Sequence, residues 1–186
     1  GPEDFNHYAE FLRELLVPIL PRTVFLWLLR IGLIGAFVLH IHSAYSLTRM
    51  NHAARTVKYQ SPRDYVAANF ASRTMRQTGI IFSIFLVWHL FDLTFTGTGY
   101  HYVRGLAYEN VANSLARPAV ALLYMAGSIA LGIHLFHGAW SLFQSMGWNN
   151  PKFNSWRRNF AVGFAVIVTV GNLSFPIAVL AGIVSN

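Results

Sequence analysis

Residues 118–143 read PAVALLYMAGSIALGIHLFHGAWSLF, a run of apolar and small residues without a charged side chain. A helix of about 20 such residues is long enough to cross the hydrocarbon core of a bilayer. His134 and His137 lie three residues apart within this run. An imidazole without a partner is costly in such surroundings. We therefore expect a neighbouring helix, a structural hydrogen bond or an iron atom to satisfy these histidines.

Three further segments have the same character, at residues 24–47, 78–96 and 159–184. Of the 186 residues, 54% are hydrophobic and 11% are charged, whereas about a quarter of a soluble domain is charged. The sequence therefore predicts an all-α, polytopic membrane helical bundle, with four transmembrane helices in a single domain, 1–186. Apolar residues at helical spacing in residues 4–17 predict a short amphipathic helix on the outer surface.

Positive charge is concentrated in two loops, although the whole chain has a formal net charge of +7. Loop 49–77 has six basic residues against Asp64, and loop 147–159 has three basic residues and no acid. The positive-inside rule places both loops in the cytoplasm and both chain ends outside. These loops could contact anionic lipid or a cytoplasmic partner, and nucleic acid is not an expected partner. Because no signal peptide is visible, this topology leads us to expect a crossing helix upstream of residue 1.

The depths of the histidines single out one pair. His40 lies 16 residues from the outer end of its segment and His134 lies 15 residues from the outer end of its own, which correspond to about 24 and 23 Å along a helix. His89 lies only about 10 Å from the outer surface. Level histidines on different helices are what the ligation of one haem iron by two imidazoles requires.

Small residues flank both members of this pair at helical spacing, and they would let a flat macrocycle approach the backbone. Around His134 and His40 they are Gly127, Ala130, Gly138, Ser141, Ala36 and Ala44. Small residues also let membrane helices pack against each other, and a single intramembrane histidine can simply bond a carbonyl or a hydroxyl. The level placement of the two histidines favours the haem.

Other polar groups in the segments have less specific interpretations. His137, one turn deeper than His134, could bond a haem propionate or a quinone; a zinc site of these two residues lacks a third ligand. Arg30 could neutralise haem propionates or extend to the outer interface. Asp92 could orient the ring of His89 or pair with Arg30. The absence of cysteine excludes disulfides and cysteine-bound iron–sulfur clusters on this chain.

Five short motifs, in this order, carry a resemblance to a known family: WLLR, VLHIHSA, SRTMR, VWHLFDLT and GIHLFHGAWSLFQSMGW. They resemble the dihaem cytochrome b membrane-anchor subunit of succinate:quinone oxidoreductases, most closely the single-subunit, five-helix anchor of actinobacterial and related succinate dehydrogenases. The resemblance implies that the four segments are helices two to five of the family.

The resemblance also implies a cofactor and ligand set. His40 and His134 would bind the iron of an inner haem b, and His89 would bind the iron of an outer haem b, whose other ligand lies on the family's first helix and is missing from this sequence. Ser72, Arg73 and Arg76 would contact haem propionates or the docked partner, or else simply anchor the cytoplasmic end.

The implied function is electron transfer in a bacterial plasma membrane. A flavoprotein would oxidise succinate, an iron–sulfur protein would dock on the basic cytoplasmic face, and electrons would pass through the haems to a quinone, most simply menaquinone. No dicarboxylate site is expected on this chain. Three alternatives stay open: a haem-free anchor or assembly protein, a transporter with Arg30 and Asp92 on a substrate path, and a cytochrome b subunit of a hydrogenase or formate dehydrogenase.

Overall fold

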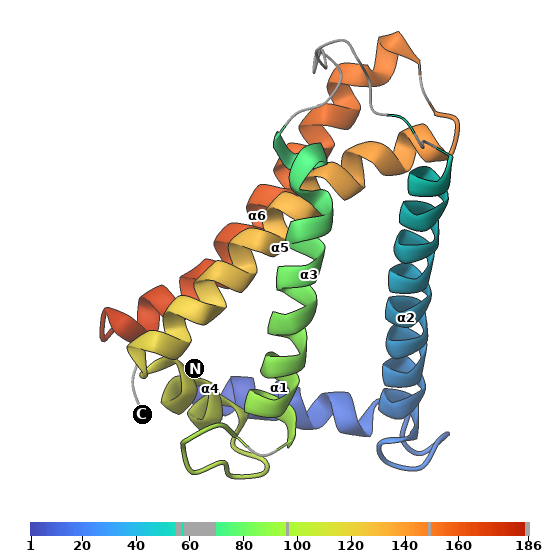
Figure 1. Cartoon of the computed structure of the whole chain (residues 1–186). Helices are drawn as coiled ribbons and strands as arrows, with labels where there is room; N and C mark the ends of the chain where they lie inside the picture. Colours follow the sequence, from blue (N-terminus) through green and yellow to red (C-terminus); the bar gives the residue numbers. More distant parts are fainter. Residues whose placement is uncertain (55–56, 58–69, 96, 149, 185–186) are drawn as a thin grey trace. The chain divides into compact units, whose positions relative to one another are not determined.

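The structure, a computed structural model, describes residues 1–54, 57, 70–95, 97–148 and 150–184 (Figure 1). Every regular element among these residues is helical, which confirms the predicted all-α class. The chain divides into two compact units, residues 1–64 and 65–186, and each is described by itself. Residues 55, 56 and 58–69 of the basic loop 49–77 lie outside the described residues.

The first unit consists of α1 (Pro2–Glu14) and α2 (Val24–Ala53). Proline at the first helical position and two acids in the first turn favour the start of α1. The backbone N–H of Thr23 donates to the carbonyl of Arg13 at 2.7 Å, and Arg22 pairs with Glu10, so the turn between the helices is tied to α1. No residue of α2 is buried within the unit. This is expected of a helix that is apolar on all sides and long enough to span a membrane.

The second unit is built around α5 (Pro118–Ser145), which packs against α3 (Phe70–Leu90) on one side and against α6 (Asn154–Leu180) on the other. Small residues on α5 allow both approaches. A Cβ on Gly127 would collide with the Phe85 ring of α3, and one on Gly132 would collide with the Thr169 hydroxyl of α6. Close backbone approach at small residues is how membrane helices commonly pack.

One end of this bundle is closed by shorter elements. The helix α3 continues into the π-helical turn η1 (Phe91–Phe95), and α4 (Ala107–Leu115) packs against η1, α5 and α6. At the other end, the 3₁₀ turn η2 (Pro151–Phe153) leads into α6. The sequence analysis predicted no helix between the segments 78–96 and 118–143 and so missed α4, whose nine residues are too few for a span and whose buried residues include the polar Asn110 and Ser114.

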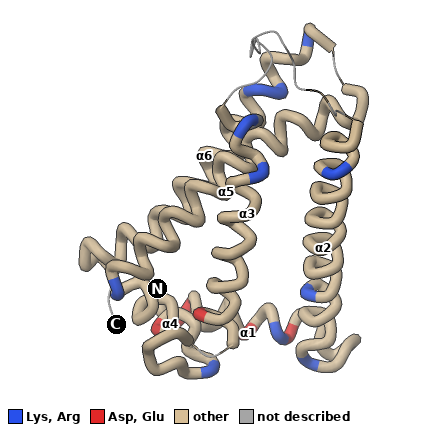
Figure 2. Tube along the Cα trace, in the orientation of Figure 1, with Lys and Arg blue, Asp and Glu red and all other residues tan. Residues whose placement is uncertain are grey.

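Four helices of the described residues are long and apolar enough to span a membrane, as predicted. Their bounds are Val24–Ala53, Arg73–Phe95, Pro118–Ser145 and Pro151–Leu180. In the second unit, basic residues gather where α3 and α6 begin, whereas both acids that the structure describes there, Asp92 and Glu109, lie toward the opposite end (Figure 2).

Candidate functional site

His134 is held by the backbone of α3. Its Nδ1 lies 3.2 Å from the carbonyl oxygen of Met75 and 3.5 Å from the Thr78 hydroxyl. A carbonyl only accepts hydrogen bonds, so Nδ1 carries the hydrogen and donates it. In a neutral imidazole this fixes the tautomer and leaves the lone pair on Nε2.

Gly79 makes the close approach of His134 to α3 possible. A Cβ at this position would lie 3.1 Å from Cε1 and 3.4 Å from Nδ1 of the His134 ring. The first distance is shorter than most such contacts and the second is ordinary, so a larger residue than glycine would displace the ring by a few tenths of an ångström. The α3 backbone therefore sets both the position and the tautomer of His134.

His89 is held differently, by aromatic rings. Its ring centroid lies 6.0 Å from that of Phe85 and 5.8 Å from that of Tyr124, while Phe85 and Tyr124 meet edge to face at 5.2 Å. These distances are those of favourable aromatic pairs. The Nδ1 of His89 is buried and has no hydrogen-bond partner among the described residues. Ring packing, rather than a hydrogen bond to this nitrogen, orients the imidazole.

The two histidines lie at different depths of the same helix pair. His134 contacts Gly79, and Tyr124, ten residues before His134 on α5, contacts His89, ten residues after Gly79 on α3. Ten helical residues correspond to about 15 Å along the axis. The antiparallel α3–α5 pair thus presents two imidazoles at two levels.

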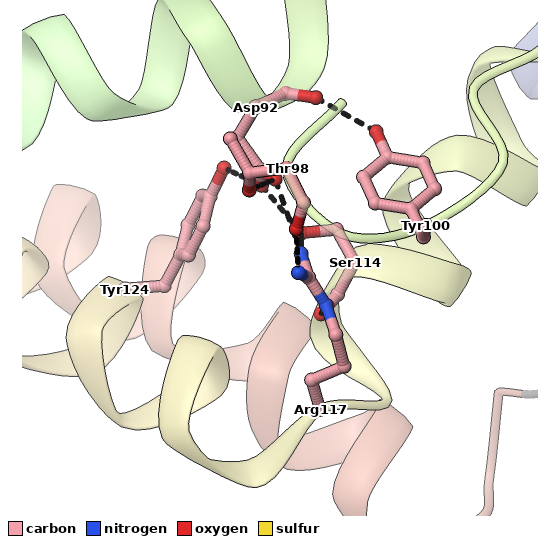
Figure 3. Close-up of polar contacts among 6 residues, drawn as sticks. All are labelled: Asp92, Thr98, Tyr100, Ser114, Arg117 and Tyr124. Atoms are coloured by element: carbon pink, nitrogen blue, oxygen red, sulfur yellow. Dashed lines mark hydrogen bonds and ion pairs between the residues drawn. The ribbon is translucent and has the colours of Figure 1, made fainter. Parts of the chain in front are cut away.

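A buried carboxylate organises the end of the bundle next to His89 (Figure 3). Asp92, in the π-helical turn η1, is 0% exposed. The hydroxyls of Thr98 and Ser114 donate to its two carboxylate oxygens, and the Tyr124 hydroxyl donates to Oδ2 at 2.8 Å. The guanidinium of Arg117 pairs with Oδ1 at 3.1 Å. The charge is therefore paired and hydrogen-bonded, as a buried charge must be.

Tyr100 completes this arrangement, which we call the Asp92 cluster: Asp92, Thr98, Tyr100, Ser114, Arg117 and Tyr124. The Tyr100 hydroxyl donates to the backbone carbonyl of Asp92 at 2.7 Å, and Arg117 lies 5.2 Å from the Tyr100 ring centroid. Burial, together with the negative charge of Asp92, raises the pKa of Tyr100 to about 12. Tyr100 is therefore a neutral donor at physiological pH, and the cluster ties η1 to α4 and α5.

The cation that contacts Asp92 is Arg117, which the sequence analysis counted only as part of a loop; the suggested partner was Arg30. In the first unit, the Arg30 guanidinium lies 5.1 Å from the ring centroid of Trp27 on its own helix. His40 lies on α2 and is exposed within that unit. Because His40 and His134 belong to different units, their pairing at one haem stays a prediction.

The remaining predicted residues lie toward the basic end of the second unit. Arg73 and Arg76 are exposed on the first two turns of α3. Ser72 lies on the same turns, and its side chain is outside the described part of the chain. The Nδ1 of His137 is buried and has no hydrogen-bond partner among the described residues, which keeps its predicted role open.

The structure shows what surrounds two of the small residues of α5. At Gly127, the Phe85 ring fills the space that the sequence analysis reserved for a macrocycle, and at Gly138 a Cβ would lie 3.8 Å from the Met75 methyl. Gly127 therefore serves helix packing, whereas a Cβ at Gly138 would make only an ordinary van der Waals contact. Within the described ranges, no group of three or more histidine, cysteine, aspartate or glutamate side chains could hold a metal ion.

Sequence reasoning missed the residues that support the two histidines, namely Gly79, Tyr124 and Arg117. One signal was available for Arg117, because it directly precedes the first residue of a span while Asp92 is near the end of the preceding span. No pattern distinguishes Gly79 from the other glycines of the spans. The partner of His134 is a backbone carbonyl, which every residue carries.

The second unit also has an apolar groove of about 620 Å³ along α5 and α6. Its walls include Ile129, Ile133, Phe136, Val162 and Val166, and Arg158 is its charged lining residue. These apolar walls suit the binding of an apolar hydrocarbon chain.

One protein family matches this chain. Its sequence model, described as the succinate dehydrogenase/fumarate reductase transmembrane subunit, matches residues 58–173, which is more than half of the sequence. The match includes α3, α4, α5 and most of α6. The comparisons with curated proteins and with solved structures gave no match.

Proposed function

The chain belongs to the succinate dehydrogenase/fumarate reductase transmembrane subunit family, and we propose that it carries electrons through haem b between the iron–sulfur subunit of that complex and a quinone. It is a multi-pass membrane subunit by its four long apolar helices. The observation that carries the proposal is the hydrogen bond of His134 Nδ1 to the Met75 carbonyl, near the end of the spanning pair where α3 begins.

This hydrogen bond is the one expected of a metal-binding histidine. Such residues almost always donate their other ring N–H to a carbonyl, a carboxylate or water, which fixes the ring and raises its basicity. The hydrogen bond at Nδ1 therefore suits a histidine that would bind the haem iron through Nε2. His40 is the proposed second ligand: it lies 16 residues after the first residue of α2, and His134 lies 16 residues after the first residue of α5.

We propose His89 as one ligand of a second haem b, at the level nearer the Asp92 cluster. Its Nδ1 is buried without a hydrogen-bond partner among the described residues, so a ring that bound iron through Nε2 would be held by its contacts with Phe85 and Tyr124 rather than by a hydrogen bond at Nδ1. The resemblance places the other axial histidine on a further helix of the family. Two levels about 15 Å apart along α3 and α5 would then separate the two sites.

When bound between two histidines, haem b supplies a one-electron iron couple whose potential depends on its ligands and surroundings. The chain's own residues would position it. His134 is fixed by α3, His89 by aromatic rings, and Arg73 and Arg76 offer positive charge for propionates or for the docked iron–sulfur subunit. The basic end of the bundle would face the cytoplasm under the positive-inside rule. The electron partner in the membrane would be menaquinone.

A haem-free anchor is the second candidate, and a specific observation favours it. The Nδ1 of His134 already has a carbonyl acceptor, and Phe85 fills the space beside Gly127, so both features also suit plain helix packing. In a haem-free anchor, the histidines would serve only to hydrogen-bond or pack neighbouring helices together.

The haem content of the purified complex separates the two functions. We expect extracted haem b at two per chain and a dithionite-reduced-minus-oxidised spectrum with the bands of a b-type cytochrome. One haem per chain would retain the His40–His134 site and make His89 structural. A colourless complex with active succinate oxidation in its soluble subunits would overturn the cytochrome function and favour the haem-free anchor.

A further inference from the structure

Tyr124 links the buried charge of the Asp92 cluster to the ring of His89. One side of its ring system meets His89 at 5.8 Å between centroids with an interplanar angle of 66°. Its hydroxyl donates to Asp92 Oδ2 at 2.8 Å. The same side chain is thus bound at its tip by a charge-assisted hydrogen bond and presents its ring to the imidazole.

The far end of this link is firmly held. Asp92 is 0% exposed and also accepts hydrogen bonds from Thr98 and Ser114, while Arg117 pairs with it at 3.1 Å. Moving the carboxylate would leave buried donors without an acceptor, at a cost of full desolvation. The Tyr124 hydroxyl therefore has one well-defined place, and its ring has little freedom.

At the other end of this link, no hydrogen bond to a described residue restrains the Nδ1 of His89. His89 packs against Tyr124 and Phe85, which also contact each other, and its buried Nδ1 has no hydrogen-bond partner among the described residues. A ligating histidine normally owes its ring orientation to a hydrogen bond at that nitrogen. Here the rings of Phe85 and Tyr124 orient the imidazole instead, and the ring of Tyr124 is itself held in place by the hydrogen bond of its hydroxyl to Asp92.

We propose that Tyr124 is a positioning residue for His89: its hydroxyl, held by Asp92, sets the plane of the imidazole, with Phe85 as a neighbouring ring that packs against both. This inference rests on the proposed function, because the plane of an axial imidazole matters where His89 binds a haem. Rotation of that plane changes how the ligand orbitals meet the iron. It therefore changes the low-spin ferric EPR signal and the reduction potential of that haem, and leaves those of the other haem unchanged.

The test compares Tyr124→Phe with Ser114→Ala in the purified complex. Both variants remove one hydroxyl from the same oxygen of Asp92, but only Tyr124 touches the His89 ring. We expect Tyr124→Phe to retain both haems and to shift the largest g value and the potential of one haem. We expect Ser114→Ala to lower thermal stability comparably and to leave both EPR signals in place.

Unchanged signals in Tyr124→Phe, or equal shifts in both variants, would overturn the positioning role. Should Tyr124→Phe fail to accumulate, Phe85→Leu tests the neighbouring ring, with a shift of the same haem signal expected and an unchanged signal contradicting the proposal. The haem count separates this from failure of the proposed function. A wild-type complex without haem, or His89→Ala with both haems intact, removes His89 as a ligand, whereas a full haem count with unmoved signals removes only the role of Tyr124.

Discussion

His134 and His89 belong to the same pair of helices, α5 and α3, but different interactions hold their rings in place. The Nδ1 of His134 lies 3.2 Å from a backbone carbonyl, and its ring fits the space over Gly79. The Nδ1 of His89 is buried without a partner among the described residues, and two aromatic rings that contact each other pack against the imidazole. The first support depends on the backbone of a neighbouring helix, and the second depends on side chains tied to a buried charge.

This difference shows where each site is vulnerable. A backbone carbonyl cannot be removed by substitution, so His134 is most easily disturbed by adding volume at Gly79. The support of His89 consists of side chains, so it can be dismantled one group at a time through Tyr124, Phe85 or the Asp92 cluster. Each of the substitutions below alters the support of one histidine, and the measurement shows whether the haem at the other histidine is unaffected.

The largest effect on the fold is expected from Asp92→Ala. It leaves the buried donors of Ser114 and Tyr124 without an acceptor and Arg117 without its ion-pair partner, and breaking such a buried pair costs about 3–5 kcal/mol. We expect the complex to accumulate poorly and to lose the haem at His89 before the haem at His134. Thermal unfolding in detergent and haem content measure this. Asp92→Asn, which keeps the shape and one acceptor oxygen, is expected to be milder; equal stability of Asp92→Ala and wild type would contradict the role of the cluster.

Gly127→Ala should act on the His89 side. The added methyl would collide with three atoms of the Phe85 ring, and overpacking of this kind costs about 1–3 kcal/mol. Since the Phe85 ring packs against His89, we expect the EPR signal of the outer haem to shift while the signal of the His134 site stays. A shift confined to the His134 site would reverse our assignment of the two environments.

Gly79→Ala should act on the His134 side with a smaller cost of about 1 kcal/mol. The new Cβ would lie 3.1 Å from Cε1 of the ring, so the imidazole must move by a few tenths of an ångström. We expect the potential of the inner haem to change and the outer haem to keep its signals. Gly163→Ala is the matched control, because no described atom lies within 4 Å of its added Cβ; it should be neutral or stabilise by about 0.5–1 kcal/mol.

Much of the fold could be predicted because the membrane imposes length and composition on each span. The predicted segments 24–47, 78–96, 118–143 and 159–184 all fall within or across the observed long helices. Each observed helix extends beyond its predicted segment at one end, since helices continue into the polar interface where composition gives no signal, but the last helix ends at Leu180 rather than at 184. The short helix α4 escaped prediction because its buried face is partly polar.

The candidate site was predictable only as a set of intramembrane histidines. The sequence places His134 and His89 at two depths but carries no information on what each ring touches. Arg117 and Asp92 are 25 residues apart and meet only because α4 and the turn before it bring them together. The support of His134 by a carbonyl is invisible in principle, since the acceptor belongs to the backbone.

The haem content of His134→Ala in the purified complex, with His137→Ala as its neighbour control, tests the central claim most directly. The account predicts that His134→Ala loses the inner haem and keeps the outer one. His137→Ala should keep both haems, with an altered potential or altered quinone kinetics. Unchanged haem content in His134→Ala would contradict the account.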